Sequence, residues 1–231
     1  MSATGDRLVE PLRPYIHKIV GAADRQSVGF VSSTWHTWLE QAAISDTVTK
    51  KVFGSIGVDA ATRPQLRAMN QDAYSPDGRL ALLIAVLIWG RGKSNGRMRD
   101  HIVKVLTDPR RESVLEETAG LSRAGKIAEA YQAWTLPGLQ APFFTKWLWA
   151  TSSGSTDHCC LVLDARVWKS LGAFGWDSRV ASGRRDWPSR YAAYVEDAHA
   201  CADRLGNGIS AEDVEFVLYW VNGETAKLKA L

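Results

Sequence analysis

The sequence predicts a mainly all-α fold. Apolar residues recur at the helical period through most of the chain, as in 34–43, where they form one stripe. The run 81–89 is apolar on all sides, which is typical of the central buried helix of an all-α domain. Only 158–163 resembles a strand, and it is short. A length of 231 residues is enough for one large domain with its own core.

The elements follow from local signals in chain order. Pro64 suits the first turn of a short helix over 63–73, and 75–78 has the composition of a turn. The buried helix is predicted from Leu80 to Trp89, and glycine-rich 90–96 is predicted to end it as a flexible loop. Further helices are expected near 97–107, 110–120, 123–134, 141–150, 165–172 and 188–205, with a loop at 173–186 and a last helix that Ser210 could cap with Asp213.

We expect a single helical domain, 1–231, arranged in two lobes. The N-terminal helices of 1–79 would form one lobe, and 80–231 would form the core. The segment 134–172 contains a hairpin that would lie at the cleft between the lobes. No internal repeat or long linker divides the chain.

Composition limits the classes of function. A net charge of +3 and a pI of about 8.8 permit an acidic partner without requiring one. An odd cysteine count without a C-x-x-C pair argues against a disulfide framework and a zinc ribbon, and predicts a reducing cytoplasm. No H-x-x-x-H spacing occurs, so no metal site is predicted. No signal peptide is evident, and the longest apolar run is too short to span a bilayer, so no membrane partner is expected.

The segment 134–168 carries the strongest functional signal. A glycine-centred hairpin at 136–140 follows one helical stretch and opens a second, which carries Lys146. An apolar run then delivers Asp164 to the start of a third helix, 164 − 146 = 18 residues later. One amine and one carboxylate can therefore meet across a compact turn. Taken alone, the apolar helix favours a Lys146 side chain that snorkels into water, and Asp164 has the sequence context of an ordinary N-cap.

This segment resembles the helix-hairpin-helix DNA glycosylases of the 8-oxoguanine DNA glycosylase type, whose core is L-P-G-x-G-x-K followed by an apolar run ending in V-D. In that family the Lys lies four residues after the hairpin glycine, where this chain has Pro142, and Lys146 lies eight residues after Gly138. Gln140 replaces the second hairpin glycine. The stretch is more similar to a divergent bacterial group with the 8-oxoguanine-glycosylase fold. The resemblance is strongest over 134–172 and weak before residue 80.

The resemblance implies a DNA glycosylase in which Lys146 attacks C1′ of a flipped nucleotide and Asp164 assists. A Schiff base formed in this way would also allow β-lyase activity. The implied partner is double-stranded DNA with one modified base flipped out, bound by a monomer without an organic cofactor. The leaving base could be 8-oxoguanine or another oxidised, alkylated or phage-modified base.

Three further groups of residues are candidates for contacts with DNA. The hairpin amides near Gly138 and Gln140 could bind a phosphate. The basic loop is a second candidate, with Arg91, Lys93, Asn95, Arg97 and Arg99 interleaved with glycine. A second, more diluted basic patch holds Arg179, Arg184, Arg185 and Arg190. Stacking on the flipped base is expected of Trp89, with Trp134 and Trp168 as further candidates.

Two other functions remain open at this point. The shifted Lys and the missing hairpin glycine allow a helical DNA- or RNA-binding module without catalysis. The tryptophan stripes allow a protein–protein interaction domain.

Overall fold

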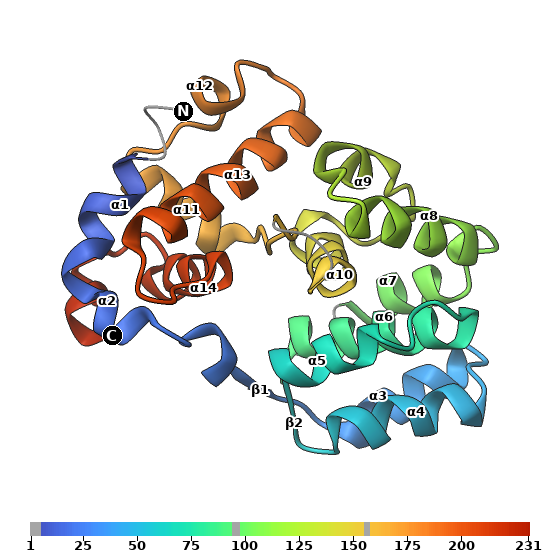
Figure 1. Ribbon diagram of the computed structural model, residues 1–231. Coiled ribbons are helices and arrows are strands. Elements are labelled where there is room, and N and C mark those ends of the chain that lie inside the picture. The colour runs from blue at the N-terminus through green and yellow to red at the C-terminus, as the bar shows by residue number, and fades with distance from the viewer. Residues whose placement is uncertain (1–5, 94–97, 155–157) are drawn as a thin grey trace.

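The computed structural model describes residues 6–93, 98–154 and 158–231, and helices dominate it (Figure 1). The predicted all-α fold is therefore confirmed. The sheet found in the described residues is a single antiparallel pair, β1 (Ser27–Gly29) and β2 (Ala60–Thr62). The helices in chain order are α1 (Asp6–Leu12), α2 (Ile16–Ile19), α3 (Ser32–Gln41), α4 (Asp46–Ile56), α5 (Arg63–Asn70), α6 (Pro76–Arg91), α7 (Arg99–Leu106), α8 (Arg111–Arg123), α9 (Ile127–Ala133), α10 (Ala141–Ser152), α11 (Ala165–Ala173), α12 (Ser178–Ser182), α13 (Trp187–Leu205) and α14 (Ala211–Val221).

Helix α6 is the buried helix that the sequence predicts, but it begins earlier. The segment 75–78 is not a free turn, because Ser75 Oγ accepts a hydrogen bond from Gly78 N at 3.1 Å and caps the helix. Pro76 then occupies the first turn, where its missing N–H costs nothing. All residues from Leu80 to Trp89 are buried, as expected for a helix that is apolar on every side.

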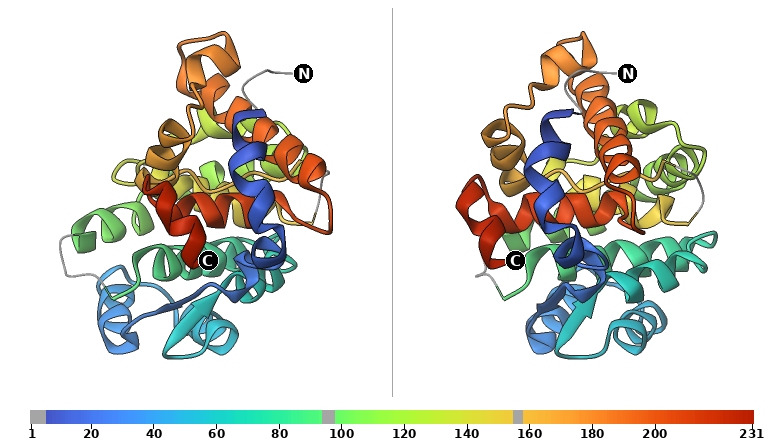
Figure 2. Two further views of the ribbon diagram at one scale, coloured as in Figure 1. Left: turned by 90° about the vertical axis from the view of Figure 1, so that its left-hand side faces the viewer. Right: turned by 60° about the vertical axis from the view of Figure 1, so that its left-hand side comes forward.

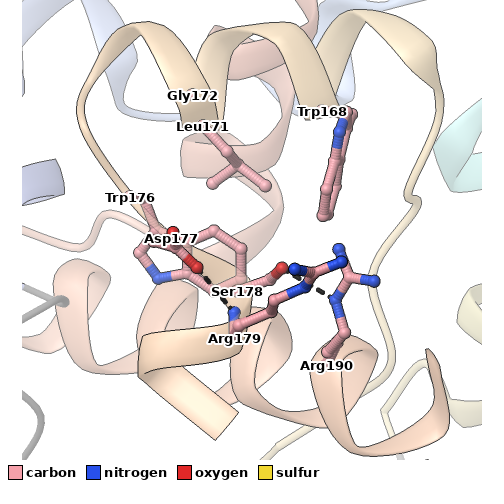
Figure 3. A pocket seen from close by; sticks show the side chains of 8 residues that line it. All are labelled: Trp168, Leu171, Gly172, Trp176, Asp177, Ser178, Arg179 and Arg190. Carbon is pink, nitrogen blue, oxygen red and sulfur yellow. Dashed lines mark hydrogen bonds between the residues drawn. The ribbon is translucent and has the colours of Figure 1, made fainter. Parts of the chain in front are cut away.

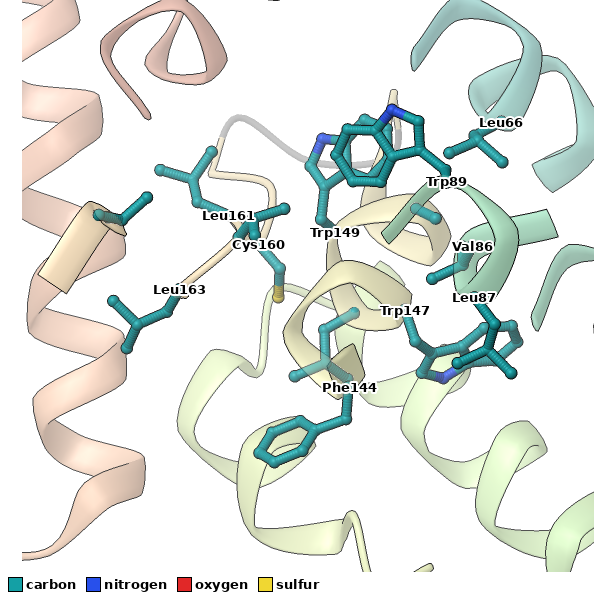
Figure 4. Close-up of a cluster of buried hydrophobic side chains, with 14 of the residues drawn as sticks. Leu66, Val86, Leu87, Trp89, Phe144, Trp147, Trp149, Cys160, Leu161 and Leu163 are labelled. Atoms are coloured by element: carbon teal, nitrogen blue, oxygen red, sulfur yellow. The ribbon is translucent and has the colours of Figure 1, made fainter. Parts of the chain in front are cut away.

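Helix α10 lies at the centre of the molecule, in contact with α5, α6, α8 and α9 (Figure 1). Its aromatic side chains point in different directions into the surrounding core (Figure 4). Trp149 stacks on Trp89 of α6, with ring centroids 5.4 Å apart, and Trp147 is fully buried. The indole N–H of Trp147 donates to Thr118 Oγ1 of α8 at 2.9 Å, so this polar group is satisfied inside the core.

The two ends of the chain meet in one group of helices. α1 packs against α13, and α14 packs against α11 and α13. In both views of Figure 2, α3, α4 and the sheet lie below this group. The lobe boundary expected at 79/80 stays a prediction, although α1 lies with the C-terminal helices.

The strand expected at 158–163 does not form. This segment has no regular secondary structure and pairs with none of the described strands. Side chains of α10 and α13 take the place of a sheet ladder and satisfy the buried backbone groups. These bonds are Cys160 N to Ser152 Oγ (2.8 Å), Leu163 N to Thr145 Oγ1 (3.0 Å), Tyr191 OH to Leu161 O (2.7 Å) and Tyr194 OH to Val162 O (3.0 Å).

The loop expected at 173–186 contains a short helix, α12. Asp177 accepts hydrogen bonds from the amides of Arg179 and Val180 and so caps this helix. The predicted cap of the last helix is confirmed, because Ser210 and Asp213 bond reciprocally as a capping box.

Candidate active site

Lys146 lies in the middle of α10 with its side chain inside the protein. Only 7% of the residue is exposed, and Nζ donates to Pro142 O at 2.6 Å. Gly90 of α6 makes room for it, because a Cβ at this position would stand 2.8 Å from Lys146 Cδ. The side chain is therefore enclosed, and the snorkelling interpretation does not describe its position.

Asp164 faces this amine from the start of α11. Its Oδ1 accepts hydrogen bonds from Arg166 N at 2.9 Å and Val167 N at 3.1 Å, which caps the helix. Its Oδ2 lies 3.8 Å from Lys146 Nζ. The two carboxylate oxygens thus have separate partners, one a helix end and the other the amine.

The position of Asp164 is fixed relative to Lys146 by the residues that precede each. Thr145 Oγ1 accepts the hydrogen bond from Leu163 N at 3.0 Å and donates to Ala141 O at 2.6 Å. One buried hydroxyl therefore ties the end of the extended segment to α10. This contact holds Lys146 close to Asp164, which lies 18 residues further along the chain, as the sequence predicted.

The surroundings of Lys146 favour the neutral amine. Burial lowers the pKa of Lys146, and the nearby Arg63 guanidinium lowers it further, while Asp164 and Glu215 oppose the shift. A neutral amine is nucleophilic, whereas an ammonium is not. Burial thus shifts this lysine toward the neutral form that covalent chemistry requires.

Lys146 and Asp164 open onto a pocket of about 300 Å³. This size is at the lower end of small-molecule sites and suits one planar ring system. Aromatic and polar side chains from distant segments complete its lining: Gln26, Arg63, Trp89, Arg91, Arg166, Glu215 and Tyr219.

The short sheet brings two of these residues together. Ser27 pairs with Thr62 in the register of β1 and β2, so Gln26 and Arg63 flank the same end of the sheet. Arg63 Nε donates to Gln26 Oε1 at 3.0 Å. The pairing orients the Gln26 amide at the pocket.

A buried ion pair lies beside the lysine. Arg63 and Glu215 are each 1% exposed, and Arg63 Nη2 lies 2.8 Å from the Glu215 carboxylate. The Arg63 guanidinium also lies 5.1 Å from the Trp89 ring and 4.8 Å from the Trp149 ring. Burial raises the pKa of Glu215 to about 7, although Arg63 opposes this shift. The pocket therefore holds a carboxyl group that can be protonated near neutral pH.

Of the three tryptophans expected to stack on a base, the structure brings only Trp89 to this pocket. Trp89 is 3% exposed, and its ring lies against Trp149 and Arg63. Trp134 stacks on Phe144 at 5.6 Å and does not line the pocket. Trp168 lines a separate pocket on α11 (Figure 3).

Tyr219 of α14 presents the more accessible aromatic ring at this site. It is partly exposed, and the Arg166 guanidinium lies 4.8 Å from its ring. The sequence analysis did not single out this residue.

The hairpin between α9 and α10 has the expected glycine-centred turn. Gly138 has φ +92°, a left-handed conformation that other residues rarely adopt, and a Cβ there would stand 3.2 Å from His101 O. Gln140 is the exposed N-cap of α10, and its carbonyl accepts from Phe143 N and Phe144 N. The hairpin thus sits against α7, with Gln140 at the surface.

The basic loop is more ordered at its start than predicted. Arg91 ends α6, is 7% exposed and places its guanidinium 4.6 Å from the Trp38 ring. Burial accordingly lowers the pKa of Arg91. Lys93 is exposed, with Cε close to Gly29. Asn95 and Arg97 lie outside the described residues.

The sequence analysis missed Gln26, Arg63 and Glu215. A usable signal was the carboxylate of Glu215 within the apolar stretch 214–221, because an ionisable group on such a helix needs a buried partner. Arg63 gave no comparable signal, since it precedes Pro64 at a helix start, where charged residues are common.

Within the described ranges, no group of three or more His, Cys, Asp or Glu side chains could hold a metal ion. None of the described helices combines the length and apolar character that a membrane crossing needs.

The all-α fold, the hairpin between α9 and α10 and the facing Lys146 and Asp164 define a class, that of helical proteins with the fold of 8-oxoguanine DNA glycosylases. The chain belongs to the family described as "Putative 8-oxoguanine DNA glycosylase OGG-like protein", whose model matches residues 21–219. The resemblance expected from 134–172 is therefore confirmed and extends over most of the chain. No curated protein and no solved structure gives a significant match.

Proposed function

We propose that this protein is a DNA glycosylase that removes a modified base through a covalent intermediate on Lys146. The observation that carries the proposal is a buried amine with a lowered pKa, 3.8 Å from a carboxylate, at the wall of a pocket large enough for one base. Membership of the 8-oxoguanine DNA glycosylase-like family supports the same activity.

The pocket can receive a base only after the nucleotide has left the duplex. Enzymes that act on a base in duplex DNA rotate the nucleotide out of the stack, which costs a few kcal/mol. Here the ring of Tyr219 is available for stacking, and the amide of Gln26 offers hydrogen bonds to the base edge.

In the chemical step, the neutral Lys146 amine attacks C1′ of the flipped nucleotide. The bond between C1′ and the base nitrogen breaks, and its electron pair leaves with the base, which takes up a proton. Asp164 Oδ2 stabilises the positive charge that develops on the sugar, and its place near Nζ suits it to accept the proton that the amine loses.

Strand cleavage follows from the same intermediate. The sugar ring opens as O4′ takes up a proton, which leaves a Schiff base between Lys146 and C1′. Loss of a proton from C2′ then expels the 3′ phosphate by β-elimination. The lyase step therefore needs no further residue to form the covalent bond.

Borohydride trapping tests this proposal, because reduction turns the Schiff base into a stable adduct. Wild-type protein incubated with oligonucleotides that carry a panel of oxidised and alkylated bases should form a protein–DNA adduct with at least one of them. Lys146→Gln should abolish the adduct. Lys169→Gln is the matched control, since Lys169 is exposed on the neighbouring helix α11, and it should leave the yield unchanged.

An adduct of full yield in Lys146→Gln would refute the assignment of the nucleophile. DNA binding by wild-type protein with neither an adduct nor base release would favour the non-catalytic binding module instead.

A further inference from the structure

A second pocket, of about 280 Å³, lies at the far end of α11 (Figure 3). Helix α11 contributes Trp168, and the start of α12 and of α13 contribute Arg179 and Arg190. Neither Lys146 nor Asp164 lines it. The pocket is therefore separate from the candidate active site.

Trp168 and Arg190 line this pocket, and the ring of Trp187 lies beside it, in contact with both. The Arg190 guanidinium lies 3.9 Å from the ring of Trp187 and 5.2 Å from that of Trp168. Arg190 Nε donates to Ser178 Oγ at 2.8 Å, which holds the guanidinium in place. Trp187 is 47% exposed, an unusual position for so large an apolar side chain.

The charges around the pocket favour an anion. Arg179, Arg184 and Arg185 are exposed. Asp177 interacts electrostatically with Arg179 and Arg190, and Asp186 with Arg184. Oδ1 of Asp177 also accepts the amide hydrogens that start α12. Four arginines thus face two carboxylates, which leaves a net positive charge that favours a negatively charged ligand.

A nucleotide satisfies both features of this pocket. Its base can stack on a tryptophan ring, and its phosphate can bind arginine. The base must be unpaired and unstacked, because both faces of a base inside a duplex are already covered. A stacked nucleotide would also cover the exposed part of Trp187.

Helix α11 relates this pocket to the active site. Asp164 caps its first turn, and Trp168 and Gly172 follow at about 6 Å and about 12 Å along the axis. A single DNA strand advances about 3.4 Å per nucleotide in B-form geometry, so this distance corresponds to a few nucleotides. One strand can therefore reach both sites.

We propose that the α11–α12–α13 pocket binds a second, unpaired nucleotide of the DNA strand whose modified base enters the Lys146 pocket. The preferred substrate is then a modified base next to locally unpaired DNA, rather than one in a fully paired duplex. The choice of strand rests on the proposed glycosylase function, whereas the binding of an unpaired nucleotide does not.

The test uses the full chain and lesion-free, fluorescently labelled DNA at one fixed salt concentration. Affinity is measured by anisotropy for a fully paired duplex and for the same duplex with a short unpaired bubble. Wild-type protein should bind the bubble about tenfold more tightly, the effect expected of one stacked base. Trp187→Ala should remove this preference and Trp187→Phe should retain most of it. Trp220→Ala, which removes a tryptophan of similar exposure (46%) from α14, should leave it unchanged.

Equal affinity of the wild-type protein for the two duplexes would overturn the proposal, and so would a preference that persists in Trp187→Ala. Should Trp187→Ala fail to fold, the surface substitution Arg179→Ala decides the question. It should weaken bubble binding and reduce the salt dependence by about one phosphate contact. An unchanged salt dependence for the bubble would then overturn the proposal.

Borohydride trapping separates this proposal from the proposed function. Trp187→Ala should still form the adduct on a saturating amount of lesion DNA, because Lys146 lies outside the second pocket. Absence of both an adduct and base release in wild-type protein would refute the glycosylase, while a bubble preference that depends on Trp187 would still stand. Adduct formation without a bubble preference would refute only the second nucleotide site.

Discussion

Asp164→Asn should change the rate of base excision and its pH dependence by separate physical effects. Asparagine keeps an oxygen that can accept from Arg166 N and Val167 N, so the cap of α11 should survive and stability should fall by no more than about 1 kcal/mol. The negative charge near Lys146 and near the reacting sugar is lost. Excision at optimal pH should therefore drop about 100-fold or more, the range expected for a positioned acid–base or electrostatic group.

The pH profile should move in a defined direction. A carboxylate 3.8 Å from Nζ raises the pKa of Lys146 and so partly offsets the lowering by burial. Without this carboxylate, burial and Arg63 lower the pKa of Lys146 with less opposition. Since the reactive form is the neutral amine, trapping by the variant should reach half its maximum at a lower pH than in the wild type.

The assay is single-turnover borohydride trapping and base release across a pH series, with thermal melting of both proteins as the control for folding. A lower maximum with the midpoint shifted to lower pH is the expected result. A midpoint that stays in place or rises would refute the electrostatic link between Asp164 and Lys146. Normal excision by a variant that melts much earlier would show that Asp164 is only a helix cap.

Two further substitutions test the surroundings of the lysine. Gly90→Ala places a methyl group 2.8 Å from Lys146 Cδ and so displaces the amine. The yield of borohydride trapping should fall by at least about tenfold, with little loss of helical circular dichroism. Full trapping activity would show that the enclosed position of Lys146 is not required. Arg63→Met leaves Glu215 buried without its partner and should cost about 3–5 kcal/mol of stability in urea unfolding. Burial raises the pKa of Glu215 from its ordinary 4.5 to about 7. Between these two pH values the folded protein holds a proton on Glu215 that the unfolded protein has lost. The contribution of this site to the free energy of unfolding therefore falls as pH rises. The loss of stability caused by Arg63→Met should therefore be larger at pH 8, where the Glu215 carboxylate is charged, than at pH 5. An equal loss of stability at both pH values would contradict the presence of a buried charge on Glu215.

The sequence predicted those parts of the structure that depend on local pattern. Local sequence signals located most of the helices, although α1, α2, α4 and α12 were not predicted. The hairpin with Lys146 and Asp164 followed from one continuous segment. The strand expected at 158–163 was wrong, because a short apolar run does not reveal whether a neighbouring strand or neighbouring side chains will satisfy its backbone.

The rest of the candidate site could not be predicted because it comes from distant segments. Gln26, Arg63 and Glu215 meet only after the sheet has formed and α14 has packed, and no spacing in the sequence records this contact. The expected roles of Trp134 and Trp168 depend on which direction each ring points, and this is set by packing partners that composition does not reveal.

The hydrogen bond between Thr145 and Leu163 has a consequence for how the protein meets its substrate. These residues directly precede Lys146 and Asp164, so the bond holds the amine and the carboxylate at their spacing. Under the proposed function, DNA binding then has no catalytic pair to assemble, and the free energy of association remains available for distorting the duplex. Selection among bases is accordingly expected in the step that moves a nucleotide into the pocket, where a weakly paired base leaves the helix more readily than an intact one.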